Sequence, residues 1–419
     1  MIFSEIFNAL PPPPAPQVAV PQRMMPETLS GWGTKTKSKQ VVSEETSKKI
    51  ATAYRCANVL SDDIAMMPFQ TYTNISNEIK RVQADGNIRN IAFLLERQPN
   101  RWMIPFIWKK TIVNWLMFWG NAYIWAPPGY YRELFILPAN ATYPVMDPDG
   151  NLWYSTIFPN LQQMHIPDVE IVHLMINSPD GLNGRSILTY ARETLGGQLA
   201  SHETRDKIAG NGLNPTAALY MSGSVDDIAR EKTRRTYLGA ADSGAVVFDD
   251  KVAKFETITM KPTDAQFLEQ INATDVDIAN FWGIPLYKIN QGKQSYESNS
   301  QQDLDYLKTT LSPYLIQWEQ GAWLKWLSAA EQAFMYSKFN REAILQTDAK
   351  TRASYIKEMI MSGQMTPNEG RQINDMSAFV GGDAHYIPAN TGQILPDGSV
   401  KSGAPTPAGA DPTTSGGQQ

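Results

Sequence analysis

Residues 264–285 of the chain read DAQFLEQINATDVDIANFWGIP. Apolar side chains recur along this stretch at helical spacing, so it predicts an amphipathic helix that ends near Gly283: Phe267, Ile271, Ile278, Phe281 and Trp282. A polar stretch, residues 283–299, follows this helix, and residues 301–327 then carry the longest helical pattern in the chain. Two predicted helices therefore flank a polar loop, and this arrangement decides how the rest of the chain is interpreted.

Another predicted helix lies upstream, at residues 186–209, and its face carries Ile187, Tyr190, Ala191, Leu195 and Leu199. Gly196 and Gly197 interrupt it, and two glycines in a helix interior cost about 2 kcal/mol of intrinsic propensity. The insert between the two helices, residues 213–260, predicts strands at 217–221, 244–248 and 254–259 and a basic helix at 225–237. The sequence therefore predicts two helices that bracket a small domain, followed by a loop and a long helix.

The first half of the chain, residues 43–180, mixes helical and strand patterns and predicts one α+β unit. Ser43 precedes two acidic residues, a typical helix start, and the helix is expected to end before Pro68. The turn Asp147-Pro148-Asp149-Gly150 between two short strand patterns predicts a β-hairpin. Further helices are expected at 89–97 and 104–119, and strands at 69–73, 121–126, 133–137, 142–146, 152–157 and 169–175.

The two ends of the chain differ in composition from its middle. Residues 1–42 contain a run of four prolines and three lysines, and they are expected to form a flexible arm. Near the other end, a helix is expected at 348–362, and Thr366 with Glu369 forms the capping-box pattern of one more helix. Residues 389–419 are rich in Gly, Pro, Ser and Thr and are expected to be disordered.

The composition excludes several classes of protein. Among 419 residues, 42 are acidic and 37 basic, a formal net charge of −5, which argues against a surface that is basic throughout. The single cysteine, Cys56, rules out a disulfide framework within the chain, and its apolar helical context indicates a buried small side chain. No apolar run reaches the ~18 residues of a membrane-spanning helix, and the N-terminus lacks the basic region of a secretory signal. We therefore expect a soluble, intracellular chain.

The sequence shows no catalytic or metal-binding constellation. Its four histidines are too far apart to make a helical zinc pair: His165, His173, His202 and His385. The phosphate-binding loop Gly-x-x-x-x-Gly-Lys-Ser/Thr, the dinucleotide fingerprint and the Gly-x-Ser-x-Gly elbow are all absent. Carboxylate pairs such as Asp226-Asp227 lie at predicted helix starts or turns, where capping explains them. We expect no enzymatic activity, no cofactor and no metal.

Four short segments stand out in order along the chain. The first is AYRCANVLSDDIAMMPF at 53–69, and the second combines LLERQPN at 94–100 with WGNAY at 119–123. The third is DGLNGRS at 180–186, and the fourth joins DAQFLE at 264–269 to FWGIP at 281–285. Each motif alone is weak. Together, and in this order, they resemble the portal proteins of tailed bacteriophages, in the branch typical of long-tailed phages, over about residues 45–385.

The resemblance implies an α+β portal fold whose parts follow one another along the chain. In order, they are the flexible arm (1–42), the wing (43–185), the first stem helix (186–212), a small α/β clip (213–260), the second stem helix (261–283), the tunnel loop (284–300), the long wing helix (301–334), the helical crown (335–388) and the disordered tail (389–419). Proteins of this family form rings, usually dodecameric, at one capsid vertex, and double-stranded DNA enters and leaves through the central channel.

The same resemblance implies a set of partners. These are further copies of the chain, double-stranded DNA bound without sequence specificity, the terminase large subunit, a head-completion or adaptor protein, and the major capsid protein or scaffold. It implies a place in the virion at the unique vertex, after assembly in the host cytoplasm, and no membrane. Two other classes remain open: a structural capsid or scaffold protein, which would lack the stem–clip–stem layout, and an enzyme whose site is assembled from distant segments.

The resemblance also suggests which residues contact partners. A channel for moving DNA needs few, flexible, polar contacts, because tight ion pairs to many phosphates would act as a brake. The expected DNA-facing residues of the tunnel loop are Lys288, Asn290, Gln291, Lys293, Gln294 and Tyr296. An ordinary surface loop is the alternative interpretation.

The expected clip helix carries a basic group, Arg230, Lys232, Arg234 and Arg235. The resemblance implies that this group docks the terminase and then the adaptor protein, and a solvated basic face is the alternative. On the first stem helix, Arg205 and Lys207 are expected either to line the channel or to pair between subunits.

Overall fold

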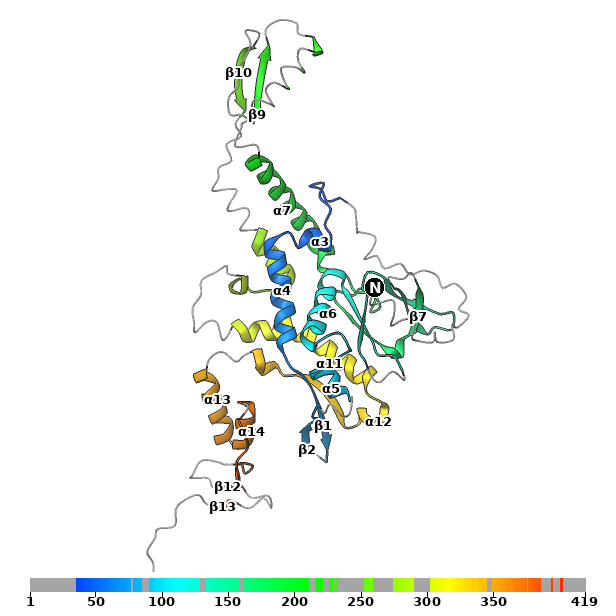
Figure 1. Cartoon of the computed structure of the whole chain (residues 1–419), viewed down its shortest axis with the longest axis vertical. Helices are drawn as coiled ribbons and strands as arrows, with labels where there is room; N and C mark the ends of the chain where they lie inside the picture. The colour runs from blue at the N-terminus through cyan, green and yellow to red at the C-terminus, as the bar shows by residue number, and fades with distance from the viewer. Residues whose placement is uncertain are drawn as a thin grey trace, which may run out of the picture. The chain divides into compact units, whose positions relative to one another are not determined.

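The chain divides into two compact units, Met1–Arg341 and Glu342–Gln419. The computed structural model describes residues 35–76, 78–84, 90–128, 133–158, 162–210, 216–221, 226–228, 231, 235, 252–258, 274–289, 302–344, 349–374, 376–385, 393–394 and 400–401. Helices and small antiparallel sheets alternate along the first unit (Figure 1), which confirms the α+β class expected from the sequence.

Helix α4 (Ala51–Met66) lies at the centre of the first unit and packs against α6 (Pro105–Trp119). Its apolar face is buried as the spacing predicts, and this face includes Cys56, whose thiol pKa is raised by burial to about 12. Helix α6 starts with a proline in its first turn and ends at Gly120, which has a φ of 76°. The expected helix at 89–97 is the shorter α5 (Ile91–Glu96).

An aromatic core joins these helices to a sheet of three strands in the order β11-β1-β2: β11 (Met335–Phe339), β1 (Phe69–Ile75) and β2 (Glu78–Arg81). Phe69 of β1 stacks on Phe339 of β11 with ring centroids 4.1 Å apart. Trp318 of α11 (Ser312–Trp326) lies 6.1 Å from Phe69 and meets Trp108 of α6 edge-on at 5.5 Å. Contacts of this kind stabilise the fold beyond the apolar area that they bury.

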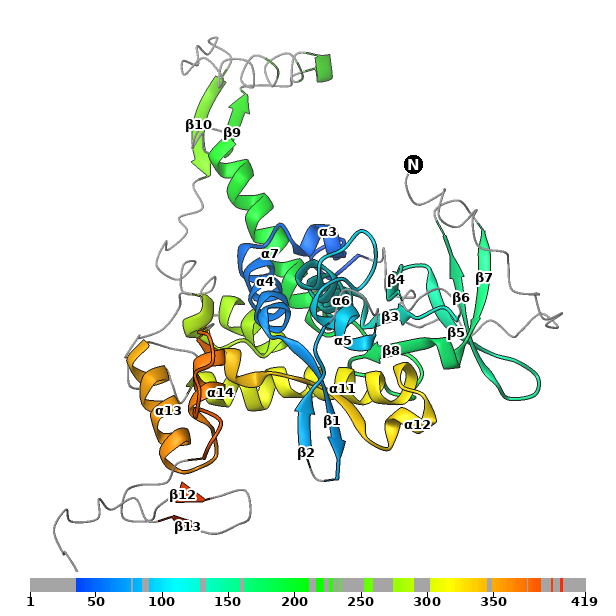
Figure 2. The ribbon, with the colours of Figure 1, turned by 60° about the horizontal axis from the view of Figure 1, so that its bottom comes forward.

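Two further sheets form the rest of the first half of the chain (Figure 2). One has the order β4-β3-β8, from β3 (Asn121–Trp125), β4 (Phe135–Leu137) and β8 (Ile171–Met175). The other has the order β5-β6-β7, from β5 (Thr142–Met146), β6 (Leu152–Ile157) and β7 (Gln163–Pro167), with a 3-10 turn at Asp168–Glu170. A buried cluster that includes Tyr123, Trp125, Tyr154 and Ile166 packs the two sheets together. The predicted hairpin turn at Asp147–Gly150 is confirmed, with Gly150 at a φ of 84°.

The helix–insert–helix layout is present in the described residues. Helix α7 (Ile187–Gly210) is followed by β9 (Thr216–Met221), which pairs antiparallel with β10 (Val252–Ile258). Residues 274–282 are helical, and a 3-10 turn, η2 (Leu286–Ile289), comes next. The long helix then runs from residue 302 through a π-helical turn, η3 (Leu307–Leu311), into α11.

Two expected boundaries are wrong. Residues 335–339 were assigned to the crown, but β11 pairs with β1 inside the first unit, so the second unit begins at Glu342. The helix expected at 301–327 ends at Trp326, as its pattern predicts, but the part assigned as the long wing helix, 301–334, is not one helix: Leu327 has extended backbone and Ser328 caps the short helix α12 (Ala329–Gln332). Ser328 competes with the helix because its side chain accepts from the backbone of Glu331.

The last part of the expected flexible arm is ordered against α7. Residues 35–42 form a tight turn with a bridge between Lys35 and Val41, and Gln40 donates to Glu203 of α7 over 2.6 Å. Thr36 is buried where α7 has Gly196, and a Cβ at that glycine would lie 2.6 Å from the Thr36 methyl group. The glycine that weakens the helix by propensity is therefore required by packing.

The described residues of the second unit include two helices, α13 (Ala349–Met361) and α14 (Pro367–Ile373), after a 3-10 turn at Arg341–Ile344. The predicted capping box is confirmed: Thr366 accepts from the backbone of Glu369, and the Glu369 carboxylate accepts from the backbone of Thr366. In the tail that was expected to be disordered, β12 (Gln393–Ile394) pairs with β13 (Val400–Lys401).

Candidate functional site

Parts of the four sequence motifs lie at two places in the first unit, and residues 264–269 of the fourth motif lie outside the described residues. At the first, which we call the α7 root, WGNAY at 119–123 contacts DGLNGRS at 180–186. At the second, which we call the loop root, the helix of the first motif contacts the turn that follows FWGIP at 281–285. The α7 root holds the beginning of the expected first stem helix, and the loop root holds the end of the expected second one.

The α7 root is closed by two glycines and one amide. Gly120 and Gly184 approach so closely that a Cβ on Gly184 would lie 1.9 Å from the Gly120 carbonyl oxygen. The amide of Asn121 then fixes Gly184 on both sides, because its Nδ2 donates to the Gly184 carbonyl and its Oδ1 accepts from the Gly184 N–H. Ser186 continues the contact by accepting from the N–H of Leu188 in the first turn of α7. Only glycine fits at positions 120 and 184, which explains why WGNAY and DGLNGRS each carry a glycine there.

A buried histidine supports the same amide. His173 of β8 donates from Nε2 to Asn121 Oδ1 over 2.9 Å, its Nδ1 accepts from the Tyr154 hydroxyl at 3.3 Å, and its ring stacks on Tyr123 at 4.4 Å. Burial lowers the pKa of His173 to about 3, so the ring is neutral near pH 7. His173 is thus a satisfied structural histidine.

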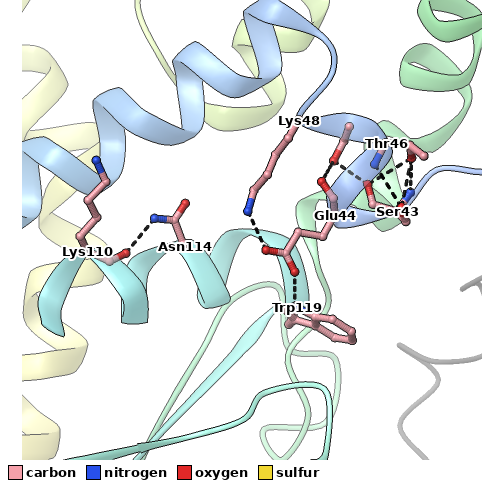
Figure 3. A network of polar contacts seen from close by, with 8 residues as sticks. Ser43, Glu44, Thr46, Lys48, Lys110, Asn114 and Trp119 are labelled. Atoms are coloured by element: carbon pink, nitrogen blue, oxygen red, sulfur yellow. Dashed lines mark hydrogen bonds and ion pairs between the residues drawn. The ribbon is translucent and has the colours of Figure 1, made fainter. Parts of the chain in front are cut away.

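A third element reaches the end of α6, as Figure 3 shows. Ser43 and Thr46 form a capping box around the short helix α3 (Glu44–Ser47). The Glu44 carboxylate accepts from the Trp119 indole over 2.9 Å and pairs with Lys48 over 2.7 Å. Helix α3 is therefore attached to the residue that immediately precedes Gly120.

The loop root begins where helix 274–282 ends. Gly283 has a φ of 65°, and its carbonyl accepts from Thr310 Oγ1 over 2.7 Å. Thr310 lies in the π-helical turn η3, an irregularity that is frequent at functional sites. Gly283 therefore turns the chain while Thr310 ties the turn to the long helix.

Lys288 is the centre of the loop root. Its ammonium lies 3.3 Å from Asp63 Oδ2 of α4 and 3.5 Å from Asp303 Oδ1 of the long helix. Its carbonyl accepts from the Arg55 guanidinium over 3.3 Å, and the neighbouring Tyr287 hydroxyl donates to Asp303 over 2.5 Å. The Lys288 side chain is only 20% exposed, so these carboxylates provide most of its surroundings.

Burial dominates the electrostatics of this cluster. It raises the pKa of Asp63, although the Lys288 ammonium and the hydrogen bond from it act in the opposite direction. Burial also raises the pKa of Tyr306, whose ring lies 4.9 Å from the ammonium and beside the Asp63 carboxyl. A half-buried lysine between two carboxylates is stable only while it stays paired.

Other predicted site residues are found mainly at exposed positions or outside the described residues. Arg235 is exposed and pairs with Glu231 one turn earlier over 3.1 Å, whereas Arg230, Lys232 and Arg234 lie outside the described residues. Arg205 of α7 is exposed, 3.9 Å from Asp206, and the side chain of Lys207 lies outside the description. The expected DNA contacts beyond Lys288 also lie outside it: Asn290, Gln291, Lys293, Gln294 and Tyr296.

The described residues contain no arrangement with evident catalytic chemistry. No group of three or more histidine, cysteine or carboxylate side chains among them has the geometry to hold a metal ion. A cavity of about 550 Å³ lies beside the loop root, and its polar lining is neutral, including Asn280, Thr309, Thr310 and Gln317. No described helix is both long enough and apolar enough to cross a membrane.

The sequence interpretation missed the partners of Lys288. Asp63 follows Leu60 by three residues and so lies on the apolar face of its helix, where a carboxylate needs a cation. That signal was available, but nothing in the sequence pairs it with a lysine more than 200 residues away. Asp303 gave no signal, since it lies in an ordinary polar helix start.

The match to a known family covers most of the chain. A family model described as "Phage portal protein" matches residues 51–375. The portal protein of Enterobacteria phage HK97 is 24% identical over 363 residues, which cover 83% of this chain and 84% of that protein. The probable portal protein of Streptomyces phage phiC31 is 23% identical and covers 88% of this chain and 84% of that protein.

Solved structures share the fold. A portal protein of the HK97 family from Corynebacterium diphtheriae superposes with a TM-score of 0.54 at 15% identity, over 72% of this chain and 96% of that one. A chain from the neck of a native gene transfer agent particle, computed with C12 symmetry, gives a TM-score of 0.54 at 17% identity, over 87% and 97% of the two chains.

Proposed function

Because the chain belongs to the phage portal protein family, in the branch of long-tailed phages, we propose that twelve copies form a closed ring at one vertex of the capsid. The observation that carries this proposal is the family match over residues 51–375 together with the described layout, in which helix α7 and helix 274–282 flank the β9–β10 pair. The protein is then a component of the virion and the connector between head and tail.

The ring needs surfaces on each chain that a neighbouring copy covers. Helix α11 buries Leu315 and Trp318 against its own core and also exposes Ile316, Trp323 and Leu324. A helix that is apolar on both sides is expected to be covered on both sides. A second copy is the proposed cover, because related chains occur in necks with C12 symmetry. Trp323→Glu is expected to prevent ring formation in native mass spectrometry, and an unchanged ring would contradict this surface.

The channel of the ring is proposed to carry double-stranded DNA during packaging and ejection, without sequence specificity. The contact residues are proposed in the segment 290–301, with Lys293 as its cation and Asn290, Gln291, Gln294 and Tyr296 as its polar side chains. A phosphate contact by Lys288 stays a prediction, and it would require both ion pairs of the loop root to open. Arg205 and Lys207 of α7 are proposed to line the same channel.

The DNA contact is tested in packaging assays with rings that carry Lys293→Ala. Lys308→Ala, an exposed lysine on the long helix, is the matched control for the loss of one positive charge per subunit. Packaging or retention of DNA is expected to fall in the first ring alone, because a ring of phosphate contacts is lost. If both rings package and retain DNA like the wild type, Lys293 does not contact the duplex.

The insert 213–260 is proposed as the docking site of the terminase large subunit and then of the head-completion adaptor, while the wing contacts the major capsid protein or scaffold. The docking role of the insert is supported by the basic group on its expected helix, in which Arg235 is exposed. Charge reversal of Arg230 and Arg234 is expected to weaken terminase binding, measured with purified rings. Unchanged binding would contradict the assignment.

A further inference from the structure

The loop root holds a lysine that the channel proposal does not explain. We propose that Lys288 and Asp303 clamp the two ends of segment 290–301 to each other and to α4, so that Lys288 is a positioning residue and Lys293 alone supplies the cation of this segment. The inference rests on the proposed function where it takes segment 290–301 to be the tunnel loop. The clamp itself consists only of described side chains.

Asp303 joins the two ends of the segment. Tyr287 and Lys288, in the 3-10 turn before the segment, reach Asp303, which belongs to the first turns of the helix after it. Tyr287 donates to Asp303 Oδ1 over 2.5 Å, and the Lys288 ammonium lies 3.5 Å from the same oxygen. One carboxylate therefore closes the segment at its base, which removes the entropy that two free ends would have.

Helix α4 holds the same base from the other side. Arg55 donates to the Lys288 carbonyl and Asp63 pairs with the Lys288 ammonium, so both the backbone and the side chain of Lys288 are attached to α4. A parallel contact joins α4 to helix 274–282, where Thr52 Oγ1 donates to Asp275 over 2.6 Å. The position of the loop base is thereby fixed relative to the wing.

The charges around Lys288 argue against a phosphate contact by this residue. Its ammonium is shared by two carboxylates, and the Asp63 side chain is only 12% exposed. If Lys288 turned to a phosphate, Asp63 would be left buried with no lysine beside it, and Asp303 would lose its cation. Nothing in the sequence indicates that Lys293 must pair with a buried carboxylate. The phosphate contact is therefore assigned to Lys293 and the positioning role to Lys288.

Hydrogen exchange of the full-length ring tests the clamp. The amides of residues 286–289 and 303–306 are measured in the wild type, in Asp303→Asn and in Lys288→Met. Both variants are expected to accelerate exchange of these amides by about tenfold, while the amides of α6 keep their wild-type rates. Asp277→Asn, an exposed carboxylate on helix 274–282, is the matched control and is expected to change neither set.

Two comparisons separate positioning from general support of the fold. Lys288→Arg keeps the cation and is expected to restore slow exchange at 286–289, and the double variant Lys288→Met/Asp303→Asn is expected to exchange no faster than Lys288→Met. The clamp is wrong if Asp303→Asn exchanges like the wild type at these amides. It is also wrong if exchange rises equally in α6, or if the two single effects simply add.

Packaging with the same rings separates this inference from the proposed function. Lys288→Arg is expected to package close to wild-type levels and Lys288→Met to package less. If exchange accelerates in Lys288→Met but packaging does not change, the clamp stands and the assigned role of segment 290–301 fails. If Lys288→Met packages as poorly as Lys293→Ala while its exchange stays slow, Lys288 contacts DNA directly and the positioning role is overturned.

Discussion

The α7 root and the loop root perform the same task with different chemistry. At the α7 root, two glycines and the Asn121 amide hold the chain by steric fit and neutral hydrogen bonds. At the loop root, Lys288, Asp63 and Asp303 hold it by charge. Steric fit tolerates almost no change, whereas half-buried ion pairs respond to salt and to the loss of a partner. The comparison indicates a rigid origin for helix α7 and an adjustable one for the segment after residue 289.

The largest expected effect breaks the α7 root. Gly184→Ala places a Cβ 1.9 Å from the Gly120 carbonyl, where backbone and not a flexible side chain has to move. We expect a loss of more than about 4 kcal/mol in the free energy of unfolding, or no folded protein at all. Chemical unfolding followed by tryptophan fluorescence measures it.

Gly181→Ala is the matched control in the same loop, because its Cβ meets open space and only the φ of 76° disfavours it. It is expected to cost about 1–2 kcal/mol. Equal stability of the two variants would show that the close approach of Gly120 and Gly184 does not hold the α7 root.

The next effect concerns pH at the α7 root. His173 has a pKa of about 3 in the folded protein, against the 6.5 of an ordinary histidine, so the unfolded chain binds a proton more readily and stability falls as pH drops below 6.5 towards 3. Between pH 6.5 and 5 this contributes about 2 kcal/mol. The stability difference between wild type and His173→Gln is expected to shrink by that amount over this range. Parallel stability curves would contradict a buried neutral histidine.

A smaller effect tests the packing of residues 35–42 on α7. Gly196→Ala is expected to destabilise the protein by about 1–2 kcal/mol through the clash with Thr36, despite the better helix propensity of alanine. Gly197→Ala, which meets nothing within 4 Å, is expected to be neutral or stabilising by up to about 1 kcal/mol. Thr36→Gly in the Gly196→Ala background is expected to restore stability, and a failure to do so would rule out this contact as the cause.

The smallest effect sharpens the comparison through salt. Salt at about 1 M screens these partly buried ion pairs less than it would exposed ones, so exchange of the amides at 286–289 is expected to rise only slightly. Amides at 184–188 in the α7 root are expected to keep their rates, because the close approach of Gly120 and Gly184 and the neutral hydrogen bonds of Asn121 and Ser186 hold them. Equal responses at the two roots would remove the distinction between them.

Local sequence patterns predicted most of the helices and strands. The elements that were missed depend on contacts between residues far apart in the chain. The helices 104–119 and 186–209 and the strands 142–146 and 152–157 follow from spacing alone, and the structure has them within a residue or two. Strands β2, β7 and β11 were missed because short strands are stabilised by their partners, and the partner of β11 lies over 260 residues earlier in the chain. The sequence showed that Gly196 lowers helix propensity, but it did not show that Thr36 packs against this glycine.

The candidate site shows the same limit. Lys288 was identified as important from its place after FWGIP, and the motif AYRCANVLSDDIA was identified as a landmark. Predicting the contact between them required the folded structure, because the sequence around a lysine in a polar segment is the same whether or not that lysine forms an ion pair. The sequence therefore pointed to Lys288 alone and predicted a phosphate contact for it, whereas the structure pairs it with Asp63 and Asp303.

The most direct test of the account is an electron cryo-microscopy reconstruction of the purified protein. We expect a closed ring of twelve 46.8-kDa chains, about 560 kDa in total, with α7 and helix 274–282 around a central channel. In that ring, segment 290–301 faces the channel while Lys288 stays between Asp63 and Asp303. A monomer, or a ring in which this segment faces away from the channel, would contradict it.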